Sequence, residues 1–117
     1  MKILLVDDEE KFVSRLAERL LLRGLEAEWA ISCDEALSKA KRVKFDIAML
    51  DVKMPSMSGI DLKKKLQKIS PDTKFIFVTG HGSEEDYNIG IKEASFYIIK
   101  PFKIETFIEK IRQALNV

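Results

Sequence analysis

Three aspartates, a threonine and a lysine follow four short apolar runs in this 117-residue chain: Asp7, Asp8, Asp51, Thr79 and Lys100. Carboxylate oxygens are the ligands that a hard divalent cation such as Mg²⁺ prefers, whereas an ammonium and a hydroxyl suit a bound anion. Phosphoryl transfer needs a metal, a cation and an aligned nucleophile, and a carboxylate can itself be that nucleophile. These residue types therefore predict Mg²⁺-dependent phosphoryl chemistry on an aspartate.

The five residues can meet only if the runs before them are parallel strands of one sheet. Residues 3–6, 47–50, 75–78 and 96–99 are continuous apolar runs, which is typical of strands covered on both faces. Residues 25–30 alternate apolar and acidic side chains, which indicates a half-exposed edge strand. The carboxyl ends of parallel strands share one edge, where ligands bind. A plainer interpretation, in which strands simply end in polar loop residues, accounts for each residue singly but not for the coherent set.

Helical patterns fill the gaps between the predicted strands. Ser32 and Glu35 have the spacing of a capping box, and Gly24 follows an apolar stripe as a helix stop. Residues 58–61 and 83–86 carry weaker start signals of the same kind. Strand and helix thus alternate five times, which predicts an α/β fold with helices on both faces of a five-stranded parallel sheet. The apolar stripes of the first and last helices are Phe12, Val13, Leu16 and Leu20, and Ile104, Phe107, Ile108, Ile111 and Leu115.

The composition fits one domain over residues 1–117, because 46% hydrophobic residues are enough for a real core. A net charge of +1 excludes a polycationic nucleic-acid coat. The single cysteine, Cys33, excludes a disulfide framework and a Cys-based zinc site and suits a reducing cytoplasm. The apolar runs are too short to span a membrane, and we expect no signal peptide before the first strand.

In this order and spacing, the motifs resemble the receiver domain of bacterial two-component response regulators along essentially the whole chain. The resemblance implies a flavodoxin-like (βα)5 three-layer sandwich whose parallel sheet has the strand order 2-1-3-4-5. It also implies a cytoplasmic signalling switch rather than a conventional enzyme. The matching motifs are Asp7-Asp8, Asp51, Met54-Pro55, Gly59, Thr79 and Lys100-Pro101-Phe102.

The resemblance assigns a role to each polar residue. Asp51 is the phosphoacceptor for a sensor histidine kinase, and Lys100 contacts the phosphoryl oxygens. Mg²⁺, for which Mn²⁺ can substitute, is held by the side chains of Asp8 and Asp51 and by the backbone carbonyl of Lys53. Asp7 acts mostly through a water on the metal. The domain then catalyses its own phosphorylation and slow dephosphorylation.

The resemblance also implies how phosphorylation changes the surface. Thr79 moves toward the phosphoryl group and the ring of Tyr97 turns inward, which alters the surface of the fourth helix, fifth strand and fifth helix. The bond before Pro101 is expected to be cis. We further hypothesise that Lys53 and His81, each two positions after a site residue, tune the lifetime of the phosphoryl group; the alternative is that both are solvated rim residues.

The expected partners are a sensor kinase, a downstream output domain or target, and a second copy of the chain when phosphorylated, with no direct contact to nucleic acid or membrane. The chain is either a stand-alone receiver or the receiver of a larger, transcriptional regulator. Two alternatives stay open: a pseudo-receiver that acts only through protein contacts, and a haloacid-dehalogenase-like phosphatase. The second wants an acid two residues after the nucleophile, where this chain has Lys53.

Overall fold

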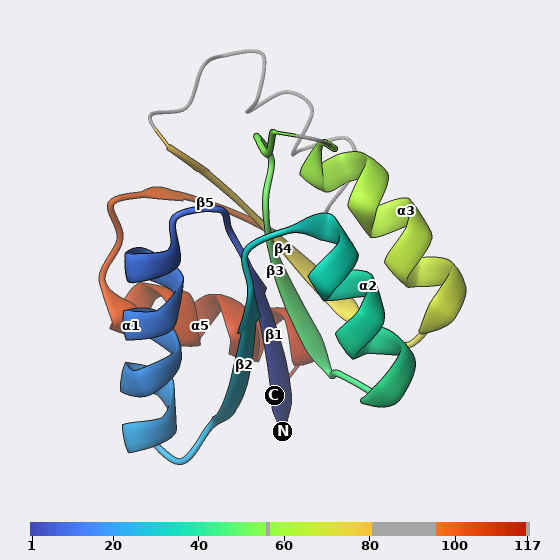
Figure 1. The fold of residues 1–117 in the computed structure, drawn as a ribbon. Helices are drawn as coiled ribbons and strands as arrows, with labels where there is room; N and C mark the ends of the chain where they lie inside the picture. Colours follow the sequence, from blue (N-terminus) through green and yellow to red (C-terminus); the bar gives the residue numbers. More distant parts are fainter. Residues whose placement is uncertain (56, 81–95, 117) are drawn as a thin grey trace.

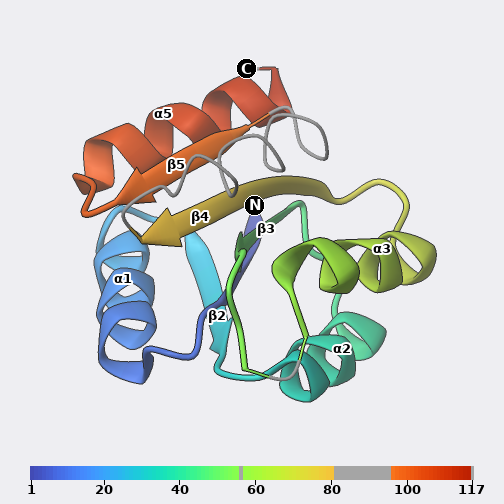
Figure 2. The same cartoon turned by 90° about the horizontal axis from the view of Figure 1, so that it is seen from above.

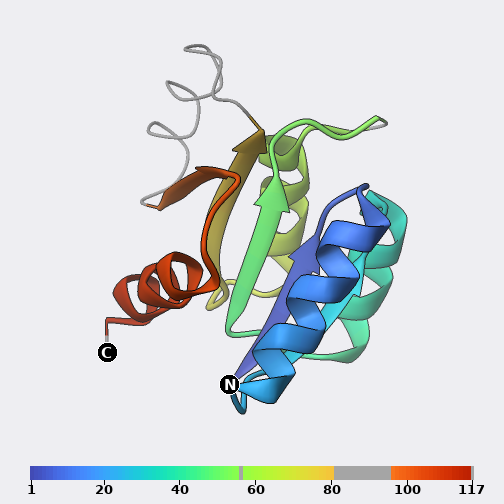
Figure 3. The ribbon, with the colours of Figure 1, turned by 90° about the vertical axis from the view of Figure 1, so that its left-hand side faces the viewer.

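Five parallel strands form a single sheet in the order β2-β1-β3-β4-β5 in the computed structural model, which describes residues 1–55, 57–80 and 96–116. The predicted strand order is confirmed. Figure 3 shows the arrowheads of β1, β3 and β4 at the same edge of the sheet. The strands are β1 (Lys2–Val6), β2 (Glu26–Ala30), β3 (Ile47–Asp51), β4 (Lys74–Gly80) and β5 (Tyr97–Lys100).

Helices cover both faces of the sheet, as predicted (Figures 1 and 2). Because side chains alternate along a strand, Ile3 and Leu5 pack toward α1 and α5, whereas Leu4 and Val6 pack toward α2 and α3. Two hydrophobic clusters therefore lie on opposite faces of the sheet and make a three-layer sandwich. The helices are α1 (Glu10–Leu22), α2 (Cys33–Arg42), α3 (Gly59–Ile69) and α5 (Ile104–Leu115).

The predicted helix ends agree with the structure. The hydroxyl of Ser32 accepts a hydrogen bond from the backbone N–H of Glu35 at 3.1 Å, and Ser58 caps α3 in the same way. Gly24 follows α1 with φ of +81°, a conformation that favours glycine. The helix predicted from residues 83–86 lies outside the described residues.

The two edge strands differ in how well their burial agrees with the prediction from the sequence. β2 lies at one edge with alternating burial, as its acidic pattern predicts. β5 lies at the other edge, where Ile98 is buried but Ile99 is 44% exposed. The expectation that this run is covered on both faces is therefore wrong at Ile99, whose side chain alternates with that of Ile98 and lies on the other face of the strand. No helix in the described ranges has both the length and the apolar character needed to cross a membrane.

Candidate phosphoryl-transfer site

The three predicted aspartates meet at the carboxyl edge of the sheet. Asp7 and Asp8 follow β1 and Asp51 ends β3, and one carboxylate oxygen from each lies within 4.8 Å of the others. Asp7 is fully buried and Asp51 is 6% exposed, whereas Asp8 is exposed to solvent. The three acids come together because β1 and β3 are neighbours in the sheet and each acid stands at or just after the end of its strand.

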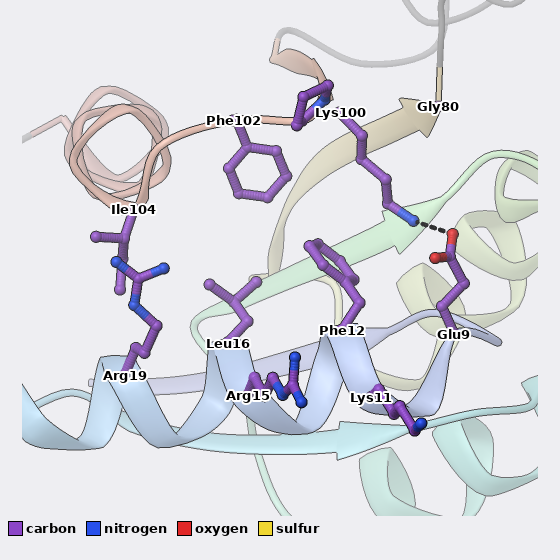
Figure 4. A pocket seen from close by; sticks show the side chains of 11 residues that line it. Glu9, Lys11, Phe12, Arg15, Leu16, Arg19, Gly80, Lys100, Phe102 and Ile104 are labelled. Atoms are coloured by element: carbon purple, nitrogen blue, oxygen red, sulfur yellow. Dashed lines mark hydrogen bonds and ion pairs between the residues drawn. The ribbon is translucent and has the colours of Figure 1, made fainter.

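Lys100 brings a positive charge to these acids from the end of β5. Its ammonium lies 2.6 Å from Oδ2 of Asp7 and 3.8 Å from Oδ2 of Asp51. It also lies 2.9 Å from Oε1 of Glu9 and 4.4 Å from the ring centroid of Phe12 (Figure 4). The lysine side chain is 13% exposed, so these contacts are only partly screened by water. The structure thus joins Lys100 to the acidic cluster, as the sequence predicted.

Burial governs the protonation of the cluster. It raises the pKa of Asp51 to about 6, with the negative charge of Asp7 adding to the rise and the Lys53 N–H and Lys100 opposing it. The pKa of Asp7 is also raised by burial, against the hydrogen bond from Lys100. Burial alone would lower the pKa of Lys100, but its hydrogen bonds to Asp7 and Glu9 outweigh this and raise it. Both carboxylates therefore lie in a place that disfavours their charge, which a bound cation would relieve.

The backbone around Asp51 is closely packed. The backbone N–H of Lys53 donates to Oδ1 of Asp51 at 3.1 Å, which fixes that oxygen. Gly59 begins α3 directly behind the strand end and donates its N–H to the carbonyl of Val52 at 3.0 Å. A Cβ on Gly59 would lie 2.2 Å from the carbonyl oxygen of Asp51, so only glycine allows this approach.

The residues expected to move with phosphorylation lie on β4 and β5. Thr79 is 1% exposed near the end of β4, and Tyr97 is half-buried at the start of β5, opposite Phe77. The Lys100–Pro101 peptide bond is cis. His81, which we connected with phosphoryl lifetime, lies outside the described residues.

A sequence model of the response regulator receiver domain matches residues 3–112. The chain belongs to this family. The sensory transduction protein RegX3 of Mycobacterium tuberculosis is 36% identical over 115 residues, which are 97% of this chain and 50% of RegX3. The receiver spans about half the length of the curated relatives it matches, several of which are transcriptional regulatory proteins.

Solved structures give the same result. The beryllofluoride-activated NtrC4 receiver domain dimer is 35% identical with a TM-score of 0.87, covering 98% of this chain and 96% of that one. A response regulator of Burkholderia pseudomallei with a phosphorylated aspartic acid and a calcium ion is 31% identical with a TM-score of 0.85, covering 94% of this chain and 65% of that one. Receiver domains are signalling phosphoacceptors that bind Mg²⁺ at an acidic pocket, and they interact with histidine kinases and output domains.

The acidic pocket of this receiver fits Mg²⁺. The converging donors of Asp7, Asp8 and Asp51 are all carboxylate oxygens, as this hard cation prefers, and the exposure of Asp8 leaves room for the waters it retains. Burial, with the charge of Asp7 adding to it, raises the pKa of Asp51, and a divalent cation would oppose both effects by favouring the charged carboxylate. The predicted contribution of the Lys53 carbonyl stays a prediction.

Two residues beside Lys100 were not predicted as part of the receiver's site. Glu9 stands in a run of four acids, residues 7–10, and nothing in the sequence singles it out. Phe12 belongs to the apolar stripe of α1 and was interpreted as core alone. Glu9 and Phe12 are three positions apart, a spacing that puts two side chains on one face of a helix. No sequence rule, however, predicts that Lys100 lies over that face.

Proposed function

We propose that this receiver is a phosphorylation-controlled switch whose Asp51 accepts a phosphoryl group from a sensor histidine kinase. The observation that carries the proposal is the placement of the Asp51 carboxylate within one cluster with Asp7 and Asp8, 3.8 Å from the ammonium of Lys100. The phosphorylated aspartic acid of the Burkholderia pseudomallei relative supports the same chemistry at this kind of site.

In the proposed reaction, a carboxylate oxygen of Asp51 attacks the phosphorus of a phosphohistidine. The phosphorus–nitrogen bond breaks, the imidazole leaves with its electron pair, and an acyl phosphate forms on Asp51. Lys100 neutralises negative charge on the transferred group, and the Lys53 N–H holds Oδ1 of the nucleophile in place. Mg²⁺ held by Asp7, Asp8, Asp51 and the Lys53 carbonyl would supply further charge neutralisation and orient the phosphoryl oxygens.

Signal output follows from a change at β4 and β5. Thr79 hydrogen-bonds the phosphoryl group, Tyr97 turns inward, and the surface beside α5 changes its affinity for an output domain or for a second copy of the chain. The NtrC4 relative, a beryllofluoride-activated dimer, supports the second partner. The relatives that are transcriptional regulatory proteins support a transcriptional output. In this proposal the receiver acts in the cytoplasm and itself contacts neither nucleic acid nor membrane. Water then removes the phosphoryl group, at a rate that Lys53 and His81 tune.

The test is the intact mass of the protein after incubation with acetyl phosphate, with and without Mg²⁺. We expect a single phosphoryl adduct that needs Mg²⁺ and disappears in Asp51→Asn. Asp34→Asn is the matched control, because Asp34 is an exposed aspartate in the first turn of α2 and does not belong to the cluster of Asp7, Asp8 and Asp51. An adduct that persists in Asp51→Asn would place the phosphoacceptor elsewhere. No adduct and no binding of beryllofluoride would leave a receiver that acts through protein contacts alone.

A further inference from the structure

Lys100 is shared among three carboxylates, and one of them lies outside the acidic pocket. The ammonium lies 2.6 Å from Asp7, 2.9 Å from Glu9 and 3.8 Å from Asp51. Glu9 thus contacts Lys100 more closely than the proposed phosphoacceptor does, although its own side chain is 66% exposed. Asp7 therefore holds the Lys100 ammonium at the acidic pocket, while Glu9 pulls it toward the start of α1 and Asp51 is the farthest of the three carboxylates.

Phe12 adds to this direction from the next turn of the same helix. Its ring centroid lies 4.4 Å from the Lys100 ammonium, a distance at which the ring face attracts a cation. The Phe12 ring packs edge-on against Phe102 at 5.8 Å, and Phe102 follows Pro101 in the loop from β5 to α5. Figure 4 shows the hydrogen bond from Lys100 to Glu9, with Phe12 beside the lysine. Two contacts three residues apart thus hold the ammonium over one face of α1.

We propose that Glu9 is a positioning residue that holds Lys100 in the unphosphorylated receiver and releases it when Asp51 gains a phosphoryl group. The inference rests on the proposed function, because it supposes that Lys100 is needed by that group. The new phosphoryl oxygens compete with Glu9 for the same ammonium, so Glu9 stabilises the unphosphorylated state. Lys100 changes partners without any change in covalent bonds.

Glu10 offers a control for charge alone. It is the next residue in the chain, is exposed, and carries the same charge in the first turn of α1, yet within the described ranges it forms no ion pair with Lys100. Glu9 makes no side-chain cap to α1, so replacing it removes no capping hydrogen bond from the helix. Glu9→Gln and Glu10→Gln therefore remove the same charge from nearly the same place, but only the first removes an ion pair of Lys100, which keeps its contact with Asp7.

The experiment is a calorimetric titration of wild type, Glu9→Gln and Glu10→Gln with beryllofluoride, a phosphoryl mimic, at saturating Mg²⁺, together with a titration by Mg²⁺ alone. We expect Glu9→Gln to bind beryllofluoride roughly two- to fivefold more tightly than Glu10→Gln, the range that a partly exposed ion pair supports. Mg²⁺ alone should bind Glu9→Gln no more tightly than Glu10→Gln, because the freed ammonium turns toward the carboxylates.

The outcomes separate the inference from the proposed function. Equal beryllofluoride affinities for the two variants, or a gain that Mg²⁺ alone reproduces, would overturn the role of Glu9 and leave the phosphoacceptor in place. A wild-type protein that binds Mg²⁺ but no beryllofluoride would overturn the proposed function, and the role of Glu9 with it. Thermal unfolding of each variant without Mg²⁺ checks that the fold is retained.

Discussion

An aspartate and a threonine stand at each end of the neighbouring strands β3 and β4. Asp46 and Thr73 precede the two strands at the amino edge of the sheet, and Asp51 and Thr79 stand at their carboxyl ends. Asp46 at the first edge accepts a hydrogen bond from the Lys2 N–H at 2.8 Å and is exposed. Thr73 donates its hydroxyl to the carbonyl of Phe45 at 2.6 Å and pairs with the Ser70 hydroxyl at 2.8 Å. Asp46 and Thr73 are thus held by neutral hydrogen-bond partners.

The carboxyl edge arranges the same types differently. Asp51 is buried beside a second acid, its pKa is raised to about 6 by burial and by Asp7, and the ammonium of Lys100 lies 3.8 Å away. The comparison shows that a polar residue at a strand end does not by itself indicate chemistry. The functional edge differs because negative charges are buried close together there. This lowers the stability of the folded protein, and a bound cation would restore it.

The largest expected effect comes from the backbone that supports the carboxyl edge. Gly59→Ala places a Cβ 2.2 Å from the carbonyl oxygen of Asp51, so α3 must move away from the strand end. We expect the free energy of unfolding to fall by about 1–3 kcal/mol, as overpacking does, and Mg²⁺ binding to weaken. Urea unfolding and a Mg²⁺ titration measure the two effects.

Gly80→Ala is the matched control for Gly59→Ala. A Cβ on Gly80 would meet no atom of the described residues within 4 Å, although this glycine also stands at the carboxyl edge. Its substitution should change the free energy of unfolding by less than about 0.5 kcal/mol. If both alanines cost the same, the close packing behind Asp51 would not be what supports the site.

The next effect tests the charge at the carboxyl edge. The folded-state pKa of Asp51, about 6, lies above its ordinary value of 3.8, so the folded protein binds more protons than the unfolded chain between these values. Wild-type stability therefore falls as pH rises from 3.8 to 6, and the loss is complete above that window. Asp51→Asn escapes this loss, so at pH 7 without Mg²⁺ we expect it to be more stable by about 1–2 kcal/mol, allowing for partial solvation.

Asp46→Asn supplies the counterpart at the amino edge. The amide oxygen can still accept the Lys2 N–H, so stability at pH 7 should stay within about 0.5 kcal/mol of wild type. Unfolding of both variants across pH 3–8 tests the contrast. A stabilisation by Asp46→Asn as large as that by Asp51→Asn would mean that the two edges do not differ in charge.

Much of this difference could be predicted from the sequence, because it depends on local pattern. A polar residue directly after a buried apolar run, as at Asp51 and Thr79, places a side chain at a known edge of the sheet. The cap at Ser32 and the alternation in β2 are local in the same sense. Such features need no knowledge of distant contacts.

The rest depends on contacts between residues far apart in the chain. Glu9 and Lys100 are 91 positions apart, and which acid of the run 7–10 reaches the lysine is set by where α1 begins and where β5 lies. Phe12 fits the core stripe equally well with or without a cation above its ring. The exposure of Ile99 on the edge strand β5 likewise depends on what packs against that face, which the apolar composition of the run does not reveal.

The smallest expected effect compares the two threonines. Thr73→Val leaves the carbonyl of Phe45 and the hydroxyl of Ser70 without this partner, so the free energy of unfolding should fall by about 1 kcal/mol with beryllofluoride affinity unchanged. Thr79→Val should instead weaken beryllofluoride binding about tenfold, the value of one hydrogen bond to a charged group. Calorimetric titration with Mg²⁺ present, alongside urea unfolding, measures both. Should Thr73→Val weaken beryllofluoride binding as much as Thr79→Val does, the phosphoryl chemistry would not be confined to the carboxyl edge.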